Sequence, residues 1–182
     1  MHPKRTMKAK NDVAVYVIRD VLDAQTKSKE LTERCLKHHF GRSVQILRKE
    51  NGKPCFSDPS LGTFNLSHSA DIFVLAVFCG GEVGIDVECP QENKNYSRLI
   101  RKYCAECERK EDFFRVWTAK EACCKLTGEG LSGMGRVKIS FSPYRADVQG
   151  CGCLYLYDLS VAVGAPCTLA TDKEVTWKVN DL

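Results

Sequence analysis

The sequence predicts a mixed α+β fold in which two α/β halves pack together and leave a cleft between them. The 182 residues are 43% hydrophobic and 27% charged, which is enough for one substantial core or two small fused ones. Strand-like and helix-like segments alternate along the chain, with one main helix in each half. Each half also has a late apolar run typical of a hairpin strand, at Ile72 to Phe78 and at Leu159 to Ala165.

The first half, at about 11–80, begins with a buried strand at 13–18, where every residue is apolar. A helix is expected at about 26–39. Gly41 ends it, because glycine readily adopts the left-handed conformation that often follows a helix. Asn51-Gly52 predicts a tight turn. The other strands of this half are expected at 44–49, near residue 56 and at 72–78. Residues 1–10 are expected to be disordered.

The second half, at about 81–182, starts with a strand at 83–87 that follows the Gly80-Gly81 turn. Gly128 is expected to end the main helix of this half. The remaining elements are helices at 97–107 and 110–126 and strands at 137–142, 153–157, 159–165 and 175–179. We expect both halves to form a single domain over residues 1–182, because no linker or low-complexity segment separates them.

Two carboxylates end the strand at 83–87. Apolar and acidic residues alternate in Gly84-Ile85-Asp86-Val87-Glu88. Side chains two apart on a strand share a face, so Asp86 and Glu88 lie side by side. Adjacent carboxylates repel each other unless a positive charge lies between them, and a hard divalent cation such as Mg²⁺ provides that charge. The simpler interpretation is an exposed acidic strand end.

The helix at 110–126 carries charged residues on its apolar side. Trp117, Glu121 and Lys125 are four residues apart, so their side chains form one stripe on the helix. Trp117 is the apolar anchor of this stripe, so Glu121 and Lys125 are expected to point toward the protein as well. Glu121 can supply a third carboxylate, and Lys125 can contact a phosphate one turn further on. The alternative is a surface ion pair worth a few tenths of a kcal/mol. Lys120 lies off this stripe, and its role stays open.

Two polar segments precede the acidic strand. Pro54 forces Lys53 into an extended conformation, which projects the lysine side chain. Further on, alternate residues share one polar face where a core strand is normally apolar. These residues are Asn65, Ser67 and Ser69. His68, between the two serines, is a candidate anion contact, and the alternative is a structural histidine.

The composition limits the classes of partner and compartment. A net charge of +4 and a pI of about 8.5 fit anionic partners but are too weak to indicate nucleic acid. No apolar run is long enough for a membrane span or a signal peptide, so we expect a cytoplasmic protein. The 11 cysteines are expected to be free thiols. The alternative is a zinc site formed by Cys104-x-x-Cys107 and Cys151-x-Cys153.

Four motifs occur in a fixed order along the chain. They are Gly52-Lys53-Pro54, Asn65-Leu66-Ser67-His68-Ser69, Gly84-Ile85-Asp86-Val87-Glu88 and Trp117-Thr118-Ala119-Lys120-Glu121-Ala122-Cys123-Cys124-Lys125. Together they resemble the 4′-phosphopantetheinyl transferase superfamily, in its two-halved form named for the surfactin-synthetase activator. The resemblance covers about 26–165, in a chain shorter than typical two-halved members. It implies that family's fold, with the active site in the cleft between the halves.

The resemblance also implies an activity. Such enzymes transfer 4′-phosphopantetheine from coenzyme A to a serine hydroxyl of an acyl or peptidyl carrier protein, with Mg²⁺ as cofactor and adenosine 3′,5′-bisphosphate as the second product. The implied metal ligands are Asp86, Glu88 and Glu121. Glu121 also accepts the serine proton, and Lys125 contacts the pyrophosphate. The implied coenzyme A contacts are Lys53 and Pro54 beside the adenine and Ser67 and His68 on phosphate. A monomer is expected.

Two other functions stay open from the sequence. One is a catalytically degenerate module that binds coenzyme A or a carrier protein, although a binding module has no need of the complete set of acids and lysine. The other is a Mg²⁺-dependent phosphohydrolase. A basic helical face, formed by Arg98, Arg101 and Lys102, is a candidate docking surface for an acidic carrier protein, and the alternative is a solvated face.

Overall fold

In the computed structural model, which describes residues 11–110 and 112–182, strand β1 (Asp12–Ile18) is buried on both faces. Its odd-numbered residues from 13 to 17 pack into a core shared with a second sheet. Its even-numbered residues from 14 to 18 pack into a core shared with helix α1 (Ser28–Phe40). Two buried faces explain why this strand is a continuous apolar run rather than an alternating one. The expected disorder of residues 1–10 lies outside the described residues.

The first sheet has four strands in the order β11-β1-β5-β4. Its other members are β4 (Thr63–Ser69), β5 (Ile72–Phe78) and β11 (Thr176–Asp181). The end of the chain therefore returns to the first sheet, where β11 pairs in parallel with β1. A separate two-stranded ribbon joins β2 (Ile46–Arg48) to β3 (Pro54–Phe56). Gly41 ends α1 with a φ of 67°, as expected.

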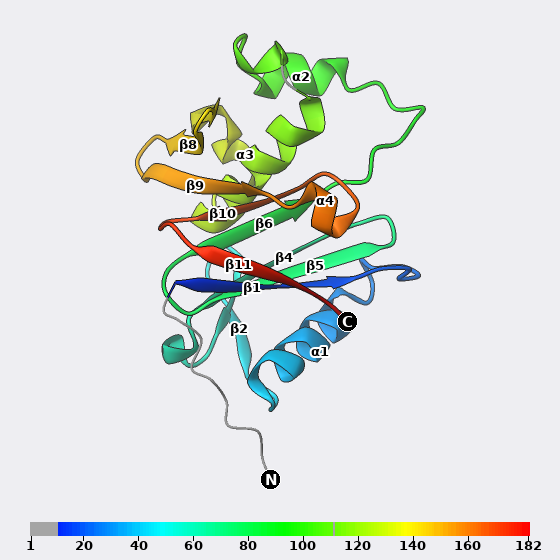
Figure 1. The fold of residues 1–182 in the computed structure, drawn as a ribbon, viewed down its shortest axis with the longest axis vertical. Helices are drawn as coiled ribbons and strands as arrows, with labels where there is room; N and C mark the ends of the chain where they lie inside the picture. Colours follow the sequence, from blue (N-terminus) through cyan, green and yellow to red (C-terminus); the bar gives the residue numbers. More distant parts are fainter. Residues whose placement is uncertain (1–10, 111) are drawn as a thin grey trace.

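The second sheet has five strands in the order β6-β10-β9-β8-β7. They are β6 (Val83–Val87), β7 (Val137–Phe141), β8 (Tyr144–Val148), β9 (Gly152–Asp158) and β10 (Cys167–Thr171). Helix α3 (Phe113–Thr127) packs on one face of this sheet. The short helix α2 (Ser97–Tyr103) lies beyond α3 (Figure 1).

The elements form four layers, in the order α1, first sheet, second sheet and α3 (Figure 1). Strand β4 ends the first sheet, and β6 ends the second. The two end strands lie beside each other, since the Asn65 side chain on β4 accepts a hydrogen bond from the Ile85 amide on β6. This arrangement confirms the predicted mixed α+β class. Within the described residues, no helix is long and apolar enough to cross a membrane.

The predicted strand from Leu159 to Ala165 is wrong. The segment contains one helical turn, α4 (Ser160–Val163), which Gly164 ends. Leu159 and Val163 are buried and four residues apart, whereas Val161 is fully exposed. That pattern has the period of a helix, because a strand would place all three side chains on one face. The apolar strand of this region is instead β10, which the sequence reading missed together with β8.

The two helices of the second half are shorter than predicted. Helix α2 ends at Tyr103, because Cys104 adopts an extended conformation. Helix α3 begins at Phe113, where the Asp112 carboxylate accepts a hydrogen bond from the Arg115 amide and caps the helix.

Candidate active site

The site lies where β4, β6 and α3 meet. Helix α3 approaches β6 closely at Gly84, where a Cβ atom would collide with the Ala122 carbonyl oxygen. Glycine at this position therefore lets the helix backbone pack directly on the strand. The close contact brings the stripe of α3 that contains Glu121 and Lys125 onto the acidic end of β6.

Asp86 is only 3% exposed and is held from two sides. Its Oδ1 accepts hydrogen bonds from Ser67 Oγ at 2.8 Å and from Lys125 Nζ at 2.6 Å. Lys125 Nζ also donates to Ser67 Oγ at 2.7 Å, so the three side chains form a closed triangle. Burial raises the pKa of the Asp86 carboxyl, and the Lys125 ammonium opposes that shift.

Glu88 is half-buried and is also held from two elements. The Trp117 indole Nε1 donates to Glu88 Oε1 at 3.1 Å, and Ser69 Oγ donates to Oε2 at 3.4 Å. Burial raises the pKa of Glu88, and the neighbouring Asp86 carboxylate raises it further. The sequence predicted Trp117 only as an apolar anchor, and its indole N–H adds a polar role that no spacing rule could have shown.

Glu121 lies on α3 between the residues that contact Glu88 and Asp86. Burial is the main cause that raises its pKa to about 7, and the negative charge of Asp86 is the second. Lys125 opposes the shift, while Glu88 adds to it. The carboxyl of Glu121 can therefore take up and release a proton near neutral pH.

The carboxylates of Asp86, Glu88 and Glu121 are the kind of oxygen ligand that a hard divalent cation prefers, but they do not converge on one point in this structure. Within residues 11–110 and 112–182, no three His, Cys, Asp or Glu side chains are grouped as a metal site. Nevertheless, Asp86 Oδ2 is buried and has no hydrogen-bond partner among the residues that the structure describes. Burial is the main cause that raises the pKa of Glu88 and Glu121, and neighbouring carboxylates raise both values further, so a bound cation would favour the charged forms.

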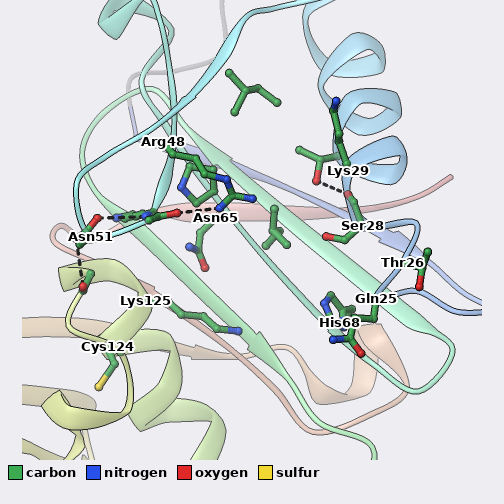
Figure 2. A pocket seen from close by; sticks show the side chains of 18 residues that line it. Gln25, Thr26, Ser28, Lys29, Arg48, Asn51, Asn65, His68, Cys124 and Lys125 are labelled. Atoms are coloured by element: carbon green, nitrogen blue, oxygen red, sulfur yellow. Dashed lines mark hydrogen bonds between the residues drawn. The ribbon is translucent and has the colours of Figure 1, made fainter.

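We call Asp86, Glu88 and Glu121 the acidic cluster. A cavity of about 630 Å³ lies beside it. The start of α1, the β2–β3 ribbon, β4 and the end of α3 form its wall (Figure 2). Its basic lining residues are Lys29, Arg48, Lys53, His68 and Lys125. Figure 2 shows Lys125 extending from α3 toward the side of the cavity where His68 lies. The cavity is thus a concave, mainly basic pocket that touches the acidic cluster through Lys125.

His68 borders this cavity from β4 and is partly buried. Burial is the main cause that lowers its pKa, the Lys125 ammonium lowers it further, and the Asp86 carboxylate opposes both. The imidazole is therefore neutral at pH 7 in the free protein.

Of the other predicted binding residues, Lys53 and Pro54 line the cavity and Ser67 does not. Lys53 Nζ donates to Glu82 Oε2 at 3.0 Å and to the Leu126 carbonyl at 2.7 Å. The Lys53 side chain is only 8% exposed, so it projects across to the end of α3 rather than into solvent. Ser67 lies outside the cavity wall, between Asp86 and Lys125.

Two further basic residues of the cavity lie outside the four motifs. Lys29 lies in the first turn of α1, and the sequence offers it beside Lys27 and Arg34 as a phosphate contact without singling one of them out. Arg48 lies on β2, where it donates to the Gly52 carbonyl at 2.9 Å, and sequence reasoning missed it because a single basic residue on a short strand carries no distinguishing signal. The structure also shows all 11 cysteines as free thiols, with Cys104 buried and Cys107, Cys151 and Cys153 exposed.

Comparison with known proteins agrees with the motifs. The family model of the 4′-phosphopantetheinyl transferase superfamily matches residues 82–149, which include β6 and α3. The chain is 31% identical over 154 residues to the 4′-phosphopantetheinyl transferase AcpT of Escherichia coli O157:H7, covering 78% of this chain and 77% of that protein.

Shorter matches involve other transferases. The chain is 39% identical over 95 residues to AcpT of Salmonella typhimurium, covering 46% of this chain and 50% of that protein. It is 31% identical over 100 residues to the 4′-phosphopantetheinyl transferase Sfp of Bacillus subtilis, covering 49% of this chain and 43% of that protein. Since the first relative is matched over most of its length and the family model covers the acidic strand and its facing helix, the chain belongs to the 4′-phosphopantetheinyl transferase superfamily and is a transferase.

Proposed function

We propose that the protein transfers the 4′-phosphopantetheine group of coenzyme A to a serine hydroxyl of an acyl or peptidyl carrier protein, in a Mg²⁺-dependent reaction. The observation that carries this proposal is the junction of two features at Lys125. The lysine lines the basic cavity, and its Nζ lies 2.6 Å from Asp86 Oδ1 in the acidic cluster. A pyrophosphate placed at that junction has cations on one side and carboxylates for a metal ion on the other.

Coenzyme A fits the chemistry of the cavity. Its several phosphates require cationic or hydrogen-bonding partners, and the wall provides Lys29, Arg48 and His68. Lys53 and Pro54 border the region proposed for the adenine. The engaged ammonium of Lys53 leaves its aliphatic stem and the proline ring as an apolar surface there.

The metal ligands in this proposal are Asp86, Glu88 and Glu121. Bound Mg²⁺ supplies charge neutralisation for the pyrophosphate. The partners of the first two carboxylates orient them before any ligand arrives: Ser67 and Lys125 hold Asp86, and Trp117 and Ser69 hold Glu88.

In this proposal, two residues of α3 accept the proton and stabilise the charge that develops during transfer. The carrier serine oxygen attacks the β-phosphate, the phosphoanhydride bond breaks, and adenosine 3′,5′-bisphosphate leaves with the bond electrons. Glu121 accepts the serine proton at a carboxylate oxygen, and a pKa of about 7 suits that task at neutral pH. Lys125 stabilises the negative charge that develops on the leaving phosphate.

The proposed partner is an acidic carrier protein that docks on α2. Arg98, Arg101 and Lys102 are exposed on this helix. Helix α2 lies next to α3, and Lys102 Nζ lies over the Tyr103 ring, which contacts the ring of Trp117. An acidic partner at α2 would therefore be close to the acidic end of β6. We also propose that the enzyme is a monomer, as the family resemblance implies, and that it acts in the cytoplasm.

A mass-shift assay tests the proposal. The protein is incubated with coenzyme A, Mg²⁺ and a panel of apo carrier proteins, and the masses of all products are recorded. Transfer adds one phosphopantetheinyl group to the carrier and releases adenosine 3′,5′-bisphosphate. Coenzyme A cleavage without a carrier would instead indicate a phosphohydrolase, and binding without any product would indicate a degenerate module.

A further inference from the structure

Four alternate side chains of β4 bridge the edges of the two sheets. Each one reaches the segment from Gly81 to Cys89, which contains β6. The contacts are Thr63 Oγ1 to the Gly81 carbonyl at 2.7 Å, the Ile85 amide to Asn65 Oδ1 at 3.0 Å, Ser67 Oγ to Asp86 Oδ1 at 2.8 Å, and Ser69 Oγ to Glu88 Oε2 at 3.4 Å. Ser69 Oγ also accepts a hydrogen bond from the Cys89 amide at 2.9 Å. We call these four side chains the β4 ladder.

The ladder replaces backbone pairing between the two sheets. Among the described strands, β4 pairs through its backbone with β5, and β6 pairs with β10. The edge of β6 that faces β4 would otherwise bury unpaired amide groups, which is unfavourable. Asn65 satisfies the Ile85 amide of β6, and Ser69 satisfies the Cys89 amide just beyond the strand. The polar face of β4 therefore belongs to the interior of the molecule, although the sequence reading found it out of place in a core strand.

The last two rungs contact carboxylates, and Ser69 does so in addition to the Cys89 amide. Ser67 donates to Asp86 Oδ1, whereas Oδ2 of the same carboxylate is buried and has no hydrogen-bond partner in the described part of the chain. Ser69 holds Glu88 by Oε2, while Trp117 holds Oε1. A carboxylate held at a defined oxygen by a short side chain on a rigid strand has a fixed direction. Groups that hydrogen-bond to a metal ligand in this way orient the ligand and change the affinity of the site for the metal ion.

We propose that Ser67 and Ser69 are positioning residues that set the directions of Asp86 and Glu88 for a hard divalent cation, whereas Thr63 and Asn65 only join the sheets. The proposal rests on the proposed function, because it takes these two carboxylates as metal ligands. It assigns the polar face of β4 to the acidic cluster and not to phosphate. It also explains why the ladder gains carboxylate partners at the acidic end of β6.

The test compares Ser67→Ala and Ser69→Ala with a matched control, Thr63→Val. The control removes a rung from the same strand face that ends on the Gly81 carbonyl, away from the carboxylates. Each variant is assayed for the Mg²⁺ concentration that gives half-maximal transfer, for the KM of coenzyme A, and for direct binding of Mn²⁺ alone by electron paramagnetic resonance. Urea unfolding of each variant records any loss of stability separately.

We expect Ser67→Ala and Ser69→Ala each to weaken Mg²⁺ activation and Mn²⁺ binding by about tenfold. Thr63→Val should leave both unchanged, and Ser69→Thr, which keeps the hydroxyl, should restore metal affinity. If the wild type needs Mg²⁺ and the two alanine variants shift no more than Thr63→Val, the ladder inference is wrong and the proposed function stands. Wild-type transfer that needs no divalent ion would overturn the metal site, and this inference with it.

Discussion

Lys120 and Glu108 form a buried ion pair whose loss has a predictable cost. Their side chains are 4% and 1% exposed, and Lys120 Nζ lies 3.0 Å from Glu108 Oε2. Lys120 Nζ also donates to the Val137 carbonyl at 2.7 Å. Glu108 accepts further hydrogen bonds from the Ala105 amide at 2.7 Å and the Ile139 amide at 3.0 Å. The pair thus joins α3 to β7 and to the turn that follows α2.

Lys120→Met is the informative perturbation. It keeps the length of the side chain but leaves the Glu108 carboxylate buried without a counter-charge, which costs about 3–5 kcal/mol in proteins. For a chain of this size, that loss lowers the midpoint of thermal unfolding by roughly 10 °C. The double variant Glu108→Gln with Lys120→Met removes both charges, so its free energy of unfolding should fall by less than the sum of the two single losses.

The assay is urea unfolding followed by tryptophan fluorescence, with transfer activity measured below the unfolding transition. Lys138→Met is the matched control, because Lys138 is exposed on β7 next to Val137 and its loss should change stability by less than about 0.5 kcal/mol. Folded Lys120→Met should retain transfer, because the Lys120 ammonium of the wild type contacts Glu108 and the Val137 carbonyl and not the proposed active site. Wild-type stability in Lys120→Met, or a folded but inactive variant, would refute this reasoning.

Three further predictions concern the proposed active site. Asp86→Ala should abolish transfer with the fold intact, which transfer assays and circular dichroism check, and full activity in that variant or in excess chelator would contradict the metal assignment. If His68 contacts the 3′-phosphate of coenzyme A, as the family resemblance implies, His68→Ala should weaken coenzyme A binding about tenfold or more but leave 3′-dephospho-coenzyme A binding unchanged, and equal losses in calorimetry would place His68 elsewhere. Because burial lowers the pKa of His68, a phosphate contact should strengthen as the pH falls and the imidazole gains a proton, a dependence absent from His68→Ala. Reversing Arg98 and Arg101 to Glu should raise the KM for carrier protein and leave that for coenzyme A unchanged, most clearly at low salt, and two unchanged KM values would exclude docking on α2.

Local patterns were enough to predict β6 and α3, the two elements that carry the acidic residues of the candidate site. The apolar run of β1, the end of α1 at Gly41, the alternation in β6 and the four-residue spacing on α3 all depend on periodicity within one segment. Periodicity shows which side chains share a face. It therefore predicted that Asp86 and Glu88 lie together and that Glu121 and Lys125 share one side of α3.

The identity of each partner depended on the packing of distant segments. No local pattern shows that β10 lies between β6 and β9, because a central strand with both faces buried has no alternation to detect. Similarly, the sequence left Lys120 without a role, and its burial against Glu108 follows from how α3 packs on β7. The polar face of β4 was visible in the sequence, but its partners on β6 came from the meeting of two sheet edges. Contacts between segments far apart in the chain form only when the layers of the fold pack together. The sequence alone therefore predicts which side chains share one face of a helix or strand, but not which element that face contacts.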